Sequence, residues 1–171
     1  MQTIKAFLAI ALLGLVIFVM ACIVSPKIFT KTAYALVKLE FEDIPEFSGT
    51  SLHQLSRNNN DSGYIIVDVR TPEERNVSII DGAIDQESFE RNRSVYQNQR
   101  IIVYCTIGYR SGFYTRSLRQ EGFDAYNLSE GILGWTHING RLLNHKKQPT
   151  KQVHVYSRPW NLGVKNGVAV F

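Results

Sequence analysis

The chain has 171 residues, 44% of them hydrophobic, and a formal net charge of +4. This length suits one domain of ordinary size plus a modest extension, and it excludes an eight-unit βα barrel or an enzyme with separate cofactor and substrate domains. No Lys/Arg-rich block and no basic stripe interleaved with aromatic residues accompanies the mild positive charge. The composition therefore gives no support for a nucleic-acid partner.

The N-terminal segment, residues 1–24, contains an uncharged and almost wholly apolar run over residues 6–24. At about 1.5 Å per residue, a helix over this run would be roughly 28 Å long, close to the hydrocarbon thickness of a bilayer. A surface helix of a soluble domain would show a polar face, and this run has none. We therefore expect residues 6–24 to contact a membrane.

Three interpretations of this segment remain open. An uncleaved single-span anchor is favoured because the run is longer than the apolar region of an ordinary signal peptide. A bacterial lipoprotein signal would use Val19-Met20-Ala21-Cys22 as its processing motif and lipidate Cys22, and a cleaved signal peptide is the third interpretation. Lys5 precedes the run and three lysines follow it closely, so the positive-inside rule favours a cytoplasmic domain only slightly. The other two interpretations place the domain outside the cytoplasm.

A second segment, residues 25–41, is expected to form a helical stalk or linker. Its apolar residues Ala33, Leu36 and Val37 fall on one face of a helix.

Residues 42–141 alternate short apolar runs with helical patterns. This alternation predicts an α/β domain built on a small parallel sheet with helices on both faces. In chain order the expected elements are an edge strand at 44–47, a short helix capped by Ser51, a turn-rich loop at 57–63, a buried strand at 64–69, a helix beginning at Thr71-Pro72, a buried strand at 101–105, a helix from 110 or 111 to 120, a strand at 124–128 and a helix at 130–138. Residues 142–171 have no clear periodicity beyond a β-like piece at 153–156, and we expect them to form an extension packed over the domain.

Cys105 is expected at the carboxyl end of a buried strand, where open parallel sheets hold their ligands. The following loop contains Gly108, which adopts backbone angles closed to other residues, and it leads into the N-terminus of a helix. Backbone N–H groups and the helix dipole in such a loop favour negative charge, so a thiol there loses its proton more easily. Arg110 adds a permanent cation able to engage an oxyanion. The pattern predicts a nucleophilic thiolate facing an anion pocket.

Three motifs, in order, make residues 42–141 resemble a single rhodanese domain. They are Val67–Glu74 followed by Asp81–Ile84, then Cys105–Ser111 in the pattern C-x-x-G-x-R-S, and finally Gly122-Phe123 through Asn127-Leu128 to Trp135. The resemblance implies a rhodanese-like fold, here preceded by one N-terminal transmembrane or signal-anchor helix. Related phosphatases use a longer C-x5-R loop, so the C-x4-R spacing favours sulfur transfer over phosphate hydrolysis.

The resemblance implies a two-step reaction without a metal or organic cofactor. The Cys105 thiolate would attack the outer sulfur of thiosulfate or another sulfane-sulfur donor, sulfite would leave, and the Cys105 persulfide would pass its sulfur to cyanide, a thiol or a protein acceptor. Asp68 and Arg70 would order the loop from behind, with an ion pair to Glu73 or Glu74. The substrate-binding residues would be Thr106, Ile107, Gly108, Tyr109, Arg110 and Ser111.

A rival hypothesis belongs to a different class of function. The domain would then be a rhodanese-fold binding module or persulfide carrier that serves a membrane partner and has little turnover of its own. Loss of the active cysteine would favour this hypothesis, and Cys105 is present.

Overall fold

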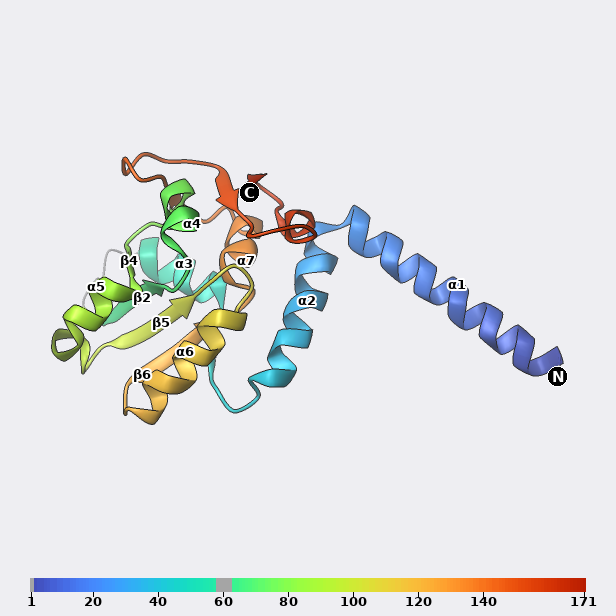
Figure 1. Cartoon of the computed structure of the whole chain (residues 1–171), viewed down its shortest axis with the longest axis horizontal. Coiled ribbons are helices and arrows are strands. Elements are labelled where there is room, and N and C mark those ends of the chain that lie inside the picture. The colour runs from blue at the N-terminus through green and yellow to red at the C-terminus, as the bar shows by residue number, and fades with distance from the viewer. Residues whose placement is uncertain (1, 58–62) are drawn as a thin grey trace.

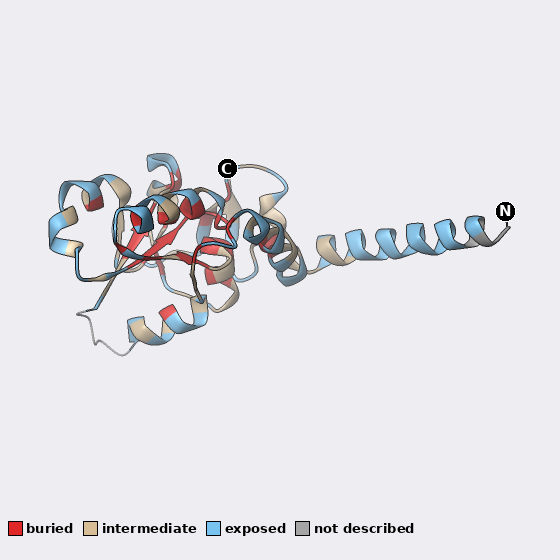
Figure 2. Ribbon diagram, turned by 90° about the horizontal axis from the view of Figure 1, so that it is seen from below, coloured by how far each residue is buried: buried red, intermediate tan, exposed pale blue. Residues whose placement is uncertain are grey.

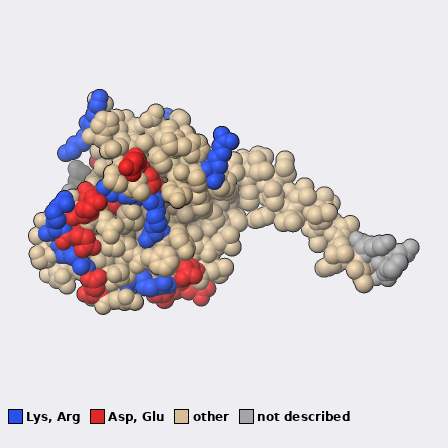
Figure 3. Space-filling view, in the orientation of Figure 1, with Lys and Arg blue, Asp and Glu red and all other residues tan. Residues whose placement is uncertain are grey.

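A computed structural model describes residues 2–57 and 63–171. The first helix, α1 (Gln2–Val24), projects from the rest of the protein as one long rod (Figure 1). Its stretch Phe7–Val24 has a mean hydropathy of 3.1 and none of it is buried against the domain. The helix is therefore long and apolar enough to cross a membrane, although a signal sequence has the same length, composition and place in a chain. The space-filling view shows this rod almost free of charge, whereas the body carries both signs (Figure 3).

The central sheet has five parallel strands in the order β1-β6-β5-β2-β4. The strands are β1 (Glu46–Phe47), β2 (Tyr64–Asp68), β4 (Ala83–Asp85), β5 (Arg100–Tyr104) and β6 (Asp124–Leu128). The central strands β2 and β5 are continuous Ile/Val-rich runs, as expected for strands that are covered on both faces. The predicted parallel α/β architecture is confirmed, and β1 occupies the edge position expected for 44–47.

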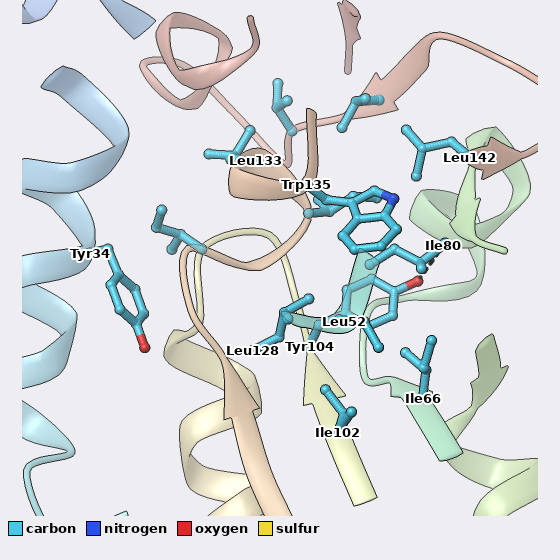
Figure 4. Close-up of a cluster of buried hydrophobic side chains, with 14 residues drawn as sticks. Tyr34, Leu52, Ile66, Ile80, Ile102, Tyr104, Leu128, Leu133, Trp135 and Leu142 are labelled. Carbon is cyan, nitrogen blue, oxygen red and sulfur yellow. Dashed lines mark hydrogen bonds between the residues drawn. The ribbon is translucent and has the colours of Figure 1, made fainter. Parts of the chain in front are cut away.

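Helices cover both faces of this sheet. They are α2 (Pro26–Glu40), α3 (Gly49–Arg57), α4 (Pro72–Val77), α5 (Gln86–Arg91), α6 (Tyr109–Gln120) and α7 (Gly131–His137), with a short 3-10 turn η1 (Arg93–Tyr96). One face packs Ile66, Ile102 and Tyr104 against residues of α2, α3, α7 and the C-terminal extension (Figure 4). The other face packs Val67, Ile101 and Val103 against α5 and α6. Buried residues accordingly concentrate in the sheet and in the helix faces beside it (Figure 2).

The helix α2 lies against the domain. Ala33 and Val37 of its apolar face pack against the core, whereas Leu36 of the same face is 66% exposed. The buried residues of the helix are Thr30 and Tyr34. Specific partners explain this burial: Thr30 donates a hydrogen bond to the Gly163 carbonyl at 3.2 Å, and the ring of Tyr34 lies over Gly108. Tertiary contacts therefore decide which residues of α2 are buried.

Two helix starts test the predicted capping residues. At α3 the hydroxyl of Ser48 accepts the backbone N–H of Ser51 at 3.0 Å, so Ser48 caps the helix and the prediction of Ser51 was wrong. At α4 the predicted cap is confirmed, because Thr71 and Glu74 form a reciprocal capping box. The loop expected at 57–63 falls mostly outside the described residues, which omit 58–62.

The C-terminal extension is folded onto the domain. Strand β7 (Leu142–Leu143) pairs antiparallel with β3 (Ile79–Ile80), and β8 (Gln152–His154) pairs parallel with β9 (Val168–Val170). Between β8 and β9 the chain forms the 3-10 turn η2 (Trp160–Gly163). Val153 and Val155 are fully buried. The extension therefore contributes to the core.

Candidate active site

The thiol of Cys105 lies directly after β5 at the entry to α6, as the sequence predicts. The residue is only 1% exposed. The backbone N–H of Gly108 donates to its Sγ at 3.2 Å. Gly112 is the first residue of α6 whose N–H bonds back along the helix, to the Gly108 carbonyl at 3.0 Å. The positive end of α6 thus lies beside the sulfur.

The first turn of α7 holds the loop backbone. Ile132 N–H donates to the Cys105 carbonyl at 3.0 Å, and Leu133 N–H donates to the Thr106 carbonyl at 3.2 Å. Because each peptide unit is planar and trans, the amides that follow these carbonyls point away from α7. Gly131 permits the approach: it has φ +53°, and a Cβ there would lie 2.5 Å from the Cys105 carbonyl oxygen.

The helix α2 touches the same loop from another side. Gly108 has φ +107°, and a Cβ there would lie 2.7 Å from Cε2 of Tyr34. Burial, together with the nearby charge of Glu46, raises the pKa of Tyr34, so its phenol stays neutral at the loop. The segment that follows the apolar helix is therefore in direct contact with the loop that holds the thiol.

A buried pair, Ser111 and Asn127, ties the loop to β6. The Asn127 amide donates to the Gly108 carbonyl at 2.9 Å, so its oxygen faces Ser111, whose hydroxyl donates to it at 2.7 Å. The same hydroxyl lies 3.5 Å from Sγ of Cys105. A hydroxyl has one proton, and the shorter contact uses it for Asn127. Sequence reasoning did not single out Asn127 for this role.

Arg110 pairs with Glu74, which the sequence analysis considered as a partner of Arg70. Its guanidinium donates to both oxygens of Glu74, at 2.7 and 2.8 Å, and to the Thr106 hydroxyl at 3.2 Å. Burial alone would raise the pKa of Glu74, but the hydrogen bonds from Arg110 and from the Thr71 backbone lower it to about 2. The positive charge of Arg110 is thus matched by a permanent negative one within the site.

Asp68 and Arg70 pair with each other behind the loop. Arg70 donates to Asp68 at 2.7 Å and to the Ser78 carbonyl at 2.6 Å. Tyr104 donates its hydroxyl to Asp68 at 2.5 Å. Burial alone would lower the pKa of Arg70, but the charge of Asp68 raises it, so Arg70 stays charged. The expected ion pair of Arg70 with Glu73 or Glu74 is wrong, because Asp68 takes Arg70 and Glu74 takes Arg110.

A cavity of about 270 Å³ opens over Cys105. It brings together five of the predicted site residues, namely Cys105, Thr106, Ile107, Tyr109 and Arg110. Gly108 and Ser111 contact the sulfur, while Asp68 and Arg70 lie behind the loop and do not line the cavity. The remaining wall comes from Tyr156 and Trp160 of the C-terminal extension, which sequence reasoning missed because that segment has no periodic pattern.

Four other cavities of the described residues contain no thiol. Within residues 2–57 and 63–171, no group of three His, Cys, Asp or Glu side chains is arranged to hold a metal ion. A larger cavity, of about 410 Å³, is lined by residues from Thr136 to Asn166 that include no thiol, imidazole or carboxylate. The thiol of Cys105, at the end of β5, is therefore the strongest candidate for the reactive group.

Comparison with protein families matches residues 51–138, more than half of the chain, to the rhodanese-like domain. A crystal structure of thiosulfate sulfurtransferase from Pseudomonas aeruginosa is similar, with 25% identity, 70% of this chain and 23% of that chain covered, and a TM-score of 0.56. The solution structure of a rhodanese-like domain from Anabaena sp. has the same fold, with 23% identity, 58% and 79% covered, and a TM-score of 0.52.

Two curated relatives carry different names. A protein of Porphyra purpurea named "Probable molybdopterin-synthase adenylyltransferase" is 32% identical over 82 residues, which are 45% of this chain and 22% of that protein. A tRNA uridine(34) hydroxylase of Agrobacterium fabrum is 29% identical over 83 residues, 43% of this chain and 26% of that protein. The chain thus spans about a quarter of the length of these relatives.

The family match covers most of the parallel sheet, together with the loop and helices around it. The match to the family model begins within α3 and ends just after α7, so it contains the Cys105 loop, Glu74 and the buried Asp68–Arg70 pair. By this match and by its fold, the protein is a member of the rhodanese-like domain family, a family of sulfurtransferases.

Proposed function

We propose that this protein is a membrane-anchored sulfurtransferase that carries sulfane sulfur as a persulfide on Cys105. The observation that carries the proposal is the position of the thiol: it lies at the base of a cavity, accepts the Gly108 N–H at 3.2 Å and faces the first turn of α6. A group that is stabilised as an anion and opens onto a cavity is suited to nucleophilic attack.

In the first step the Cys105 thiolate attacks the outer sulfur of a thiosulfate-like donor. The new S–S bond forms as the old one breaks, and the electron pair of the broken bond leaves with sulfite. Cys105 then holds a terminal persulfide anion, which the Gly108 N–H and the N-terminus of α6 stabilise as they stabilise the thiolate. In the second step a thiophilic acceptor, such as a thiol, cyanide or a protein, removes the terminal sulfur and restores the thiolate.

The test uses the full chain in detergent micelles. Incubation with thiosulfate should add one sulfur atom to the protein by intact mass, and cyanide should then release thiocyanate and remove that mass. Cys105→Ser should abolish both signals, while Cys22→Ser, which changes the other cysteine, should leave both intact. Absence of the sulfur adduct on the wild-type chain would contradict the proposal.

The same measurement distinguishes a sulfurtransferase with many turnovers from a persulfide carrier with few. A persulfide-carrier module that serves a membrane partner would load Cys105 once and release little thiocyanate per protein molecule. An enzyme would release many thiocyanate ions per protein molecule.

The membrane anchor is supported by α1, whose apolar stretch has no burial against the domain. We expect the chain to remain in the membrane fraction after an alkaline carbonate wash and to keep residues 1–24 by intact mass. A mature chain that begins at Cys22 with added lipid mass would identify a lipoprotein instead, and one that begins later would identify a cleaved signal. Protease protection in intact cells would determine the side of the membrane.

A further inference from the structure

The C-terminal extension forms one side of the cavity over Cys105. Val155 is fully buried and its N–H donates to the Val170 carbonyl at 3.1 Å, which fixes the chain where it turns toward the site. The next residues place Tyr156 and Trp160 on the cavity wall opposite the loop. The guanidinium carbon of Arg110 lies 5.8 Å from the centre of the Tyr156 ring. Two aromatic rings from outside the family match thus face the reactive thiol.

This aromatic wall is held against α2 and α7. The Gly163 carbonyl at the end of η2 accepts the Thr30 hydroxyl at 3.2 Å and lies 2.7 Å from Nε2 of His137. The ring of Trp160 packs edge-on against Phe29, with centroids 6.1 Å apart. These contacts fix Trp160, so the cavity has a formed wall rather than an open rim.

The cavity presents little net charge to a donor. The cation of Arg110 is paired with Glu74, whose pKa near 2 keeps it ionised, and among the described residues no other charged side chain lines the cavity. A dianion such as thiosulfate therefore finds no unpaired cationic side chain in this lining and depends on the backbone N–H groups at the start of α6. Most of the remaining lining is apolar or aromatic: Ile107, Tyr109, Tyr156 and Trp160.

The size of the cavity also exceeds what a small inorganic donor fills. Its volume is about 270 Å³. Thiosulfate has five heavy atoms, and an additional apolar ring would fit in the remaining space. Burial of such a ring against Tyr156 and Trp160 would contribute binding energy that the charge-balanced cavity does not offer to a dianion.

The place of the wall in the molecule agrees with an apolar ligand. Phe29, which supports Trp160, lies one helical turn after Ser25, and Ser25 directly follows the apolar helix α1. Figure 1 shows η2 beside the first turn of α2, where α1 leaves the domain. An apolar donor concentrated at a membrane surface would thus reach the cavity at the end of the domain nearest to α1.

We infer that Tyr156 and Trp160 determine donor specificity and select an organic sulfane-sulfur donor with an apolar, planar group. The inference rests on the proposed sulfur transfer. For an aryl thiosulfonate the step balances as before: the Cys105 thiolate takes the terminal sulfur, the sulfur–sulfur bond of the donor breaks, and an aryl sulfinate leaves with the electron pair. The aromatic group of the donor lies between Tyr156 and Trp160 during this step.

The experiment measures kcat/KM of the full chain in detergent micelles for benzenethiosulfonate, methanethiosulfonate and thiosulfate, with cyanide as acceptor. Tyr156→Ala is the first variant, because Tyr156 is 66% exposed and its loss leaves the core unchanged. Trp160→Ala is the second. Phe171→Ala, which removes an exposed aromatic ring of the same extension outside the cavity, is the matched control. Intrinsic donor reactivity and partition into micelles cancel when each variant is compared with the wild type.

We expect Tyr156→Ala to lower kcat/KM for benzenethiosulfonate about fivefold, and Trp160→Ala about tenfold or more, with methanethiosulfonate and thiosulfate changed less than about twofold. Phe171→Ala should match the wild type for all three donors. Equal losses for all donors in Tyr156→Ala, or no loss for any, would overturn the inference. If no donor loads Cys105, the proposed function itself fails, whereas loading by all donors without aryl selectivity refutes this inference alone.

Discussion

The cavity over Cys105 has two sides that are stabilised in different ways. On the loop side, hydrogen bonds from α7 and the Arg110–Glu74 ion pair fix the backbone. On the C-terminal side, the ring of Trp160 itself packs against Phe29, and the hydrogen bonds to α2 and α7 come from the residues after it, Gly163, Lys165 and Asn166. Directional polar contacts specify positions closely, whereas apolar packing tolerates changes of shape. We therefore expect the loop side to control the sulfur chemistry and the C-terminal side to control which donor enters.

The largest effect should follow from Gly131→Ala on the loop side. A Cβ at this position would lie 2.5 Å from the Cys105 carbonyl oxygen and 2.7 Å from that of Thr106, at a residue with φ +53°. Backbone strain and overpacking together should lower the free energy of unfolding by about 4 kcal/mol. Persulfide formation should be lost with it. Thermal unfolding followed by circular dichroism, with persulfide loading by intact mass, checks both; near wild-type loading would show that α7 does not fix the loop.

Glu74→Gln should have the next largest effect. It keeps the shape of the side chain and a cap for α4, but it leaves the charge of Arg110 without its partner in a mostly buried position. Loss of one member of such a pair costs about 3 kcal/mol of unfolding free energy. Chemical denaturation of the variant measures it. Glu73→Gln is the matched control, because Glu73 is the exposed neighbouring acid in the same turn, and it should change the stability little.

Acid should weaken the same ion pair in the wild-type protein. The pKa of Glu74 falls from 4.5 to about 2 on folding, because its hydrogen bonds to Arg110 and the Thr71 backbone outweigh burial. A lowered pKa stabilises the folded state fully above pH 4.5, and this stabilisation is lost as the pH falls toward 2. The carboxylates of Asp43, Glu73 and Asp85 also have lowered pKa values, but they are largely exposed to solvent and each contributes little.

Comparison of the wild type with Glu74→Gln isolates the contribution of Glu74 to the pH dependence of stability. Unfolding midpoints of the wild type and of Glu74→Gln, measured from pH 6 down to pH 3, should converge as the pH decreases. Parallel curves would mean that Glu74 does not titrate between the folded and unfolded states in this range. Such a result would weaken the distinction between the two sides of the cavity, because the loop side would then not depend on this ion pair.

The sequence predicted the loop side well because its signals are local. A buried strand, Cys105, Gly108 and a helix start follow one another within a few residues, and the structure places them as expected. The partner of Arg110 was not predictable in the same way. Glu74 precedes it by 36 residues, and Arg70 was an equally reasonable partner until the structure placed Asp68 against Arg70.

The C-terminal side was not predictable from pattern at all. Its strands β8 and β9 have three residues each, and η2 has four, which is too short for a hydrophobic period to emerge. Its place over the cavity depends on contacts with α2 and α7, far away in the sequence. Trp160 and Tyr156 carry no local signal that distinguishes a cavity wall from an exposed aromatic residue.

The smallest effect on the sulfur chemistry should follow from Gly163→Ala on the C-terminal side. A Cβ there would lie 2.8 Å from the Thr30 hydroxyl and 2.9 Å from Cδ1 of Leu133, so η2 must shift to admit it. Because the clashes are with side chains, we expect a loss of only about 1–2 kcal/mol in unfolding free energy. Trp160 belongs to the same turn, so the shift should lower selectivity for an aryl donor.

The control for this variant is Gly63→Ala, since no atom lies within 4 Å of a Cβ at Gly63. Gly163→Ala should keep kcat/KM for thiosulfate within about twofold of the wild type, because distant sites act independently, while the preference for benzenethiosulfonate over methanethiosulfonate decreases. If both donors and thiosulfate lose activity equally, displacement of η2 has reached the Cys105 loop through α7. The two sides of the cavity would then move together, and the assignment of sulfur chemistry to the loop side and donor selection to the C-terminal side would be wrong.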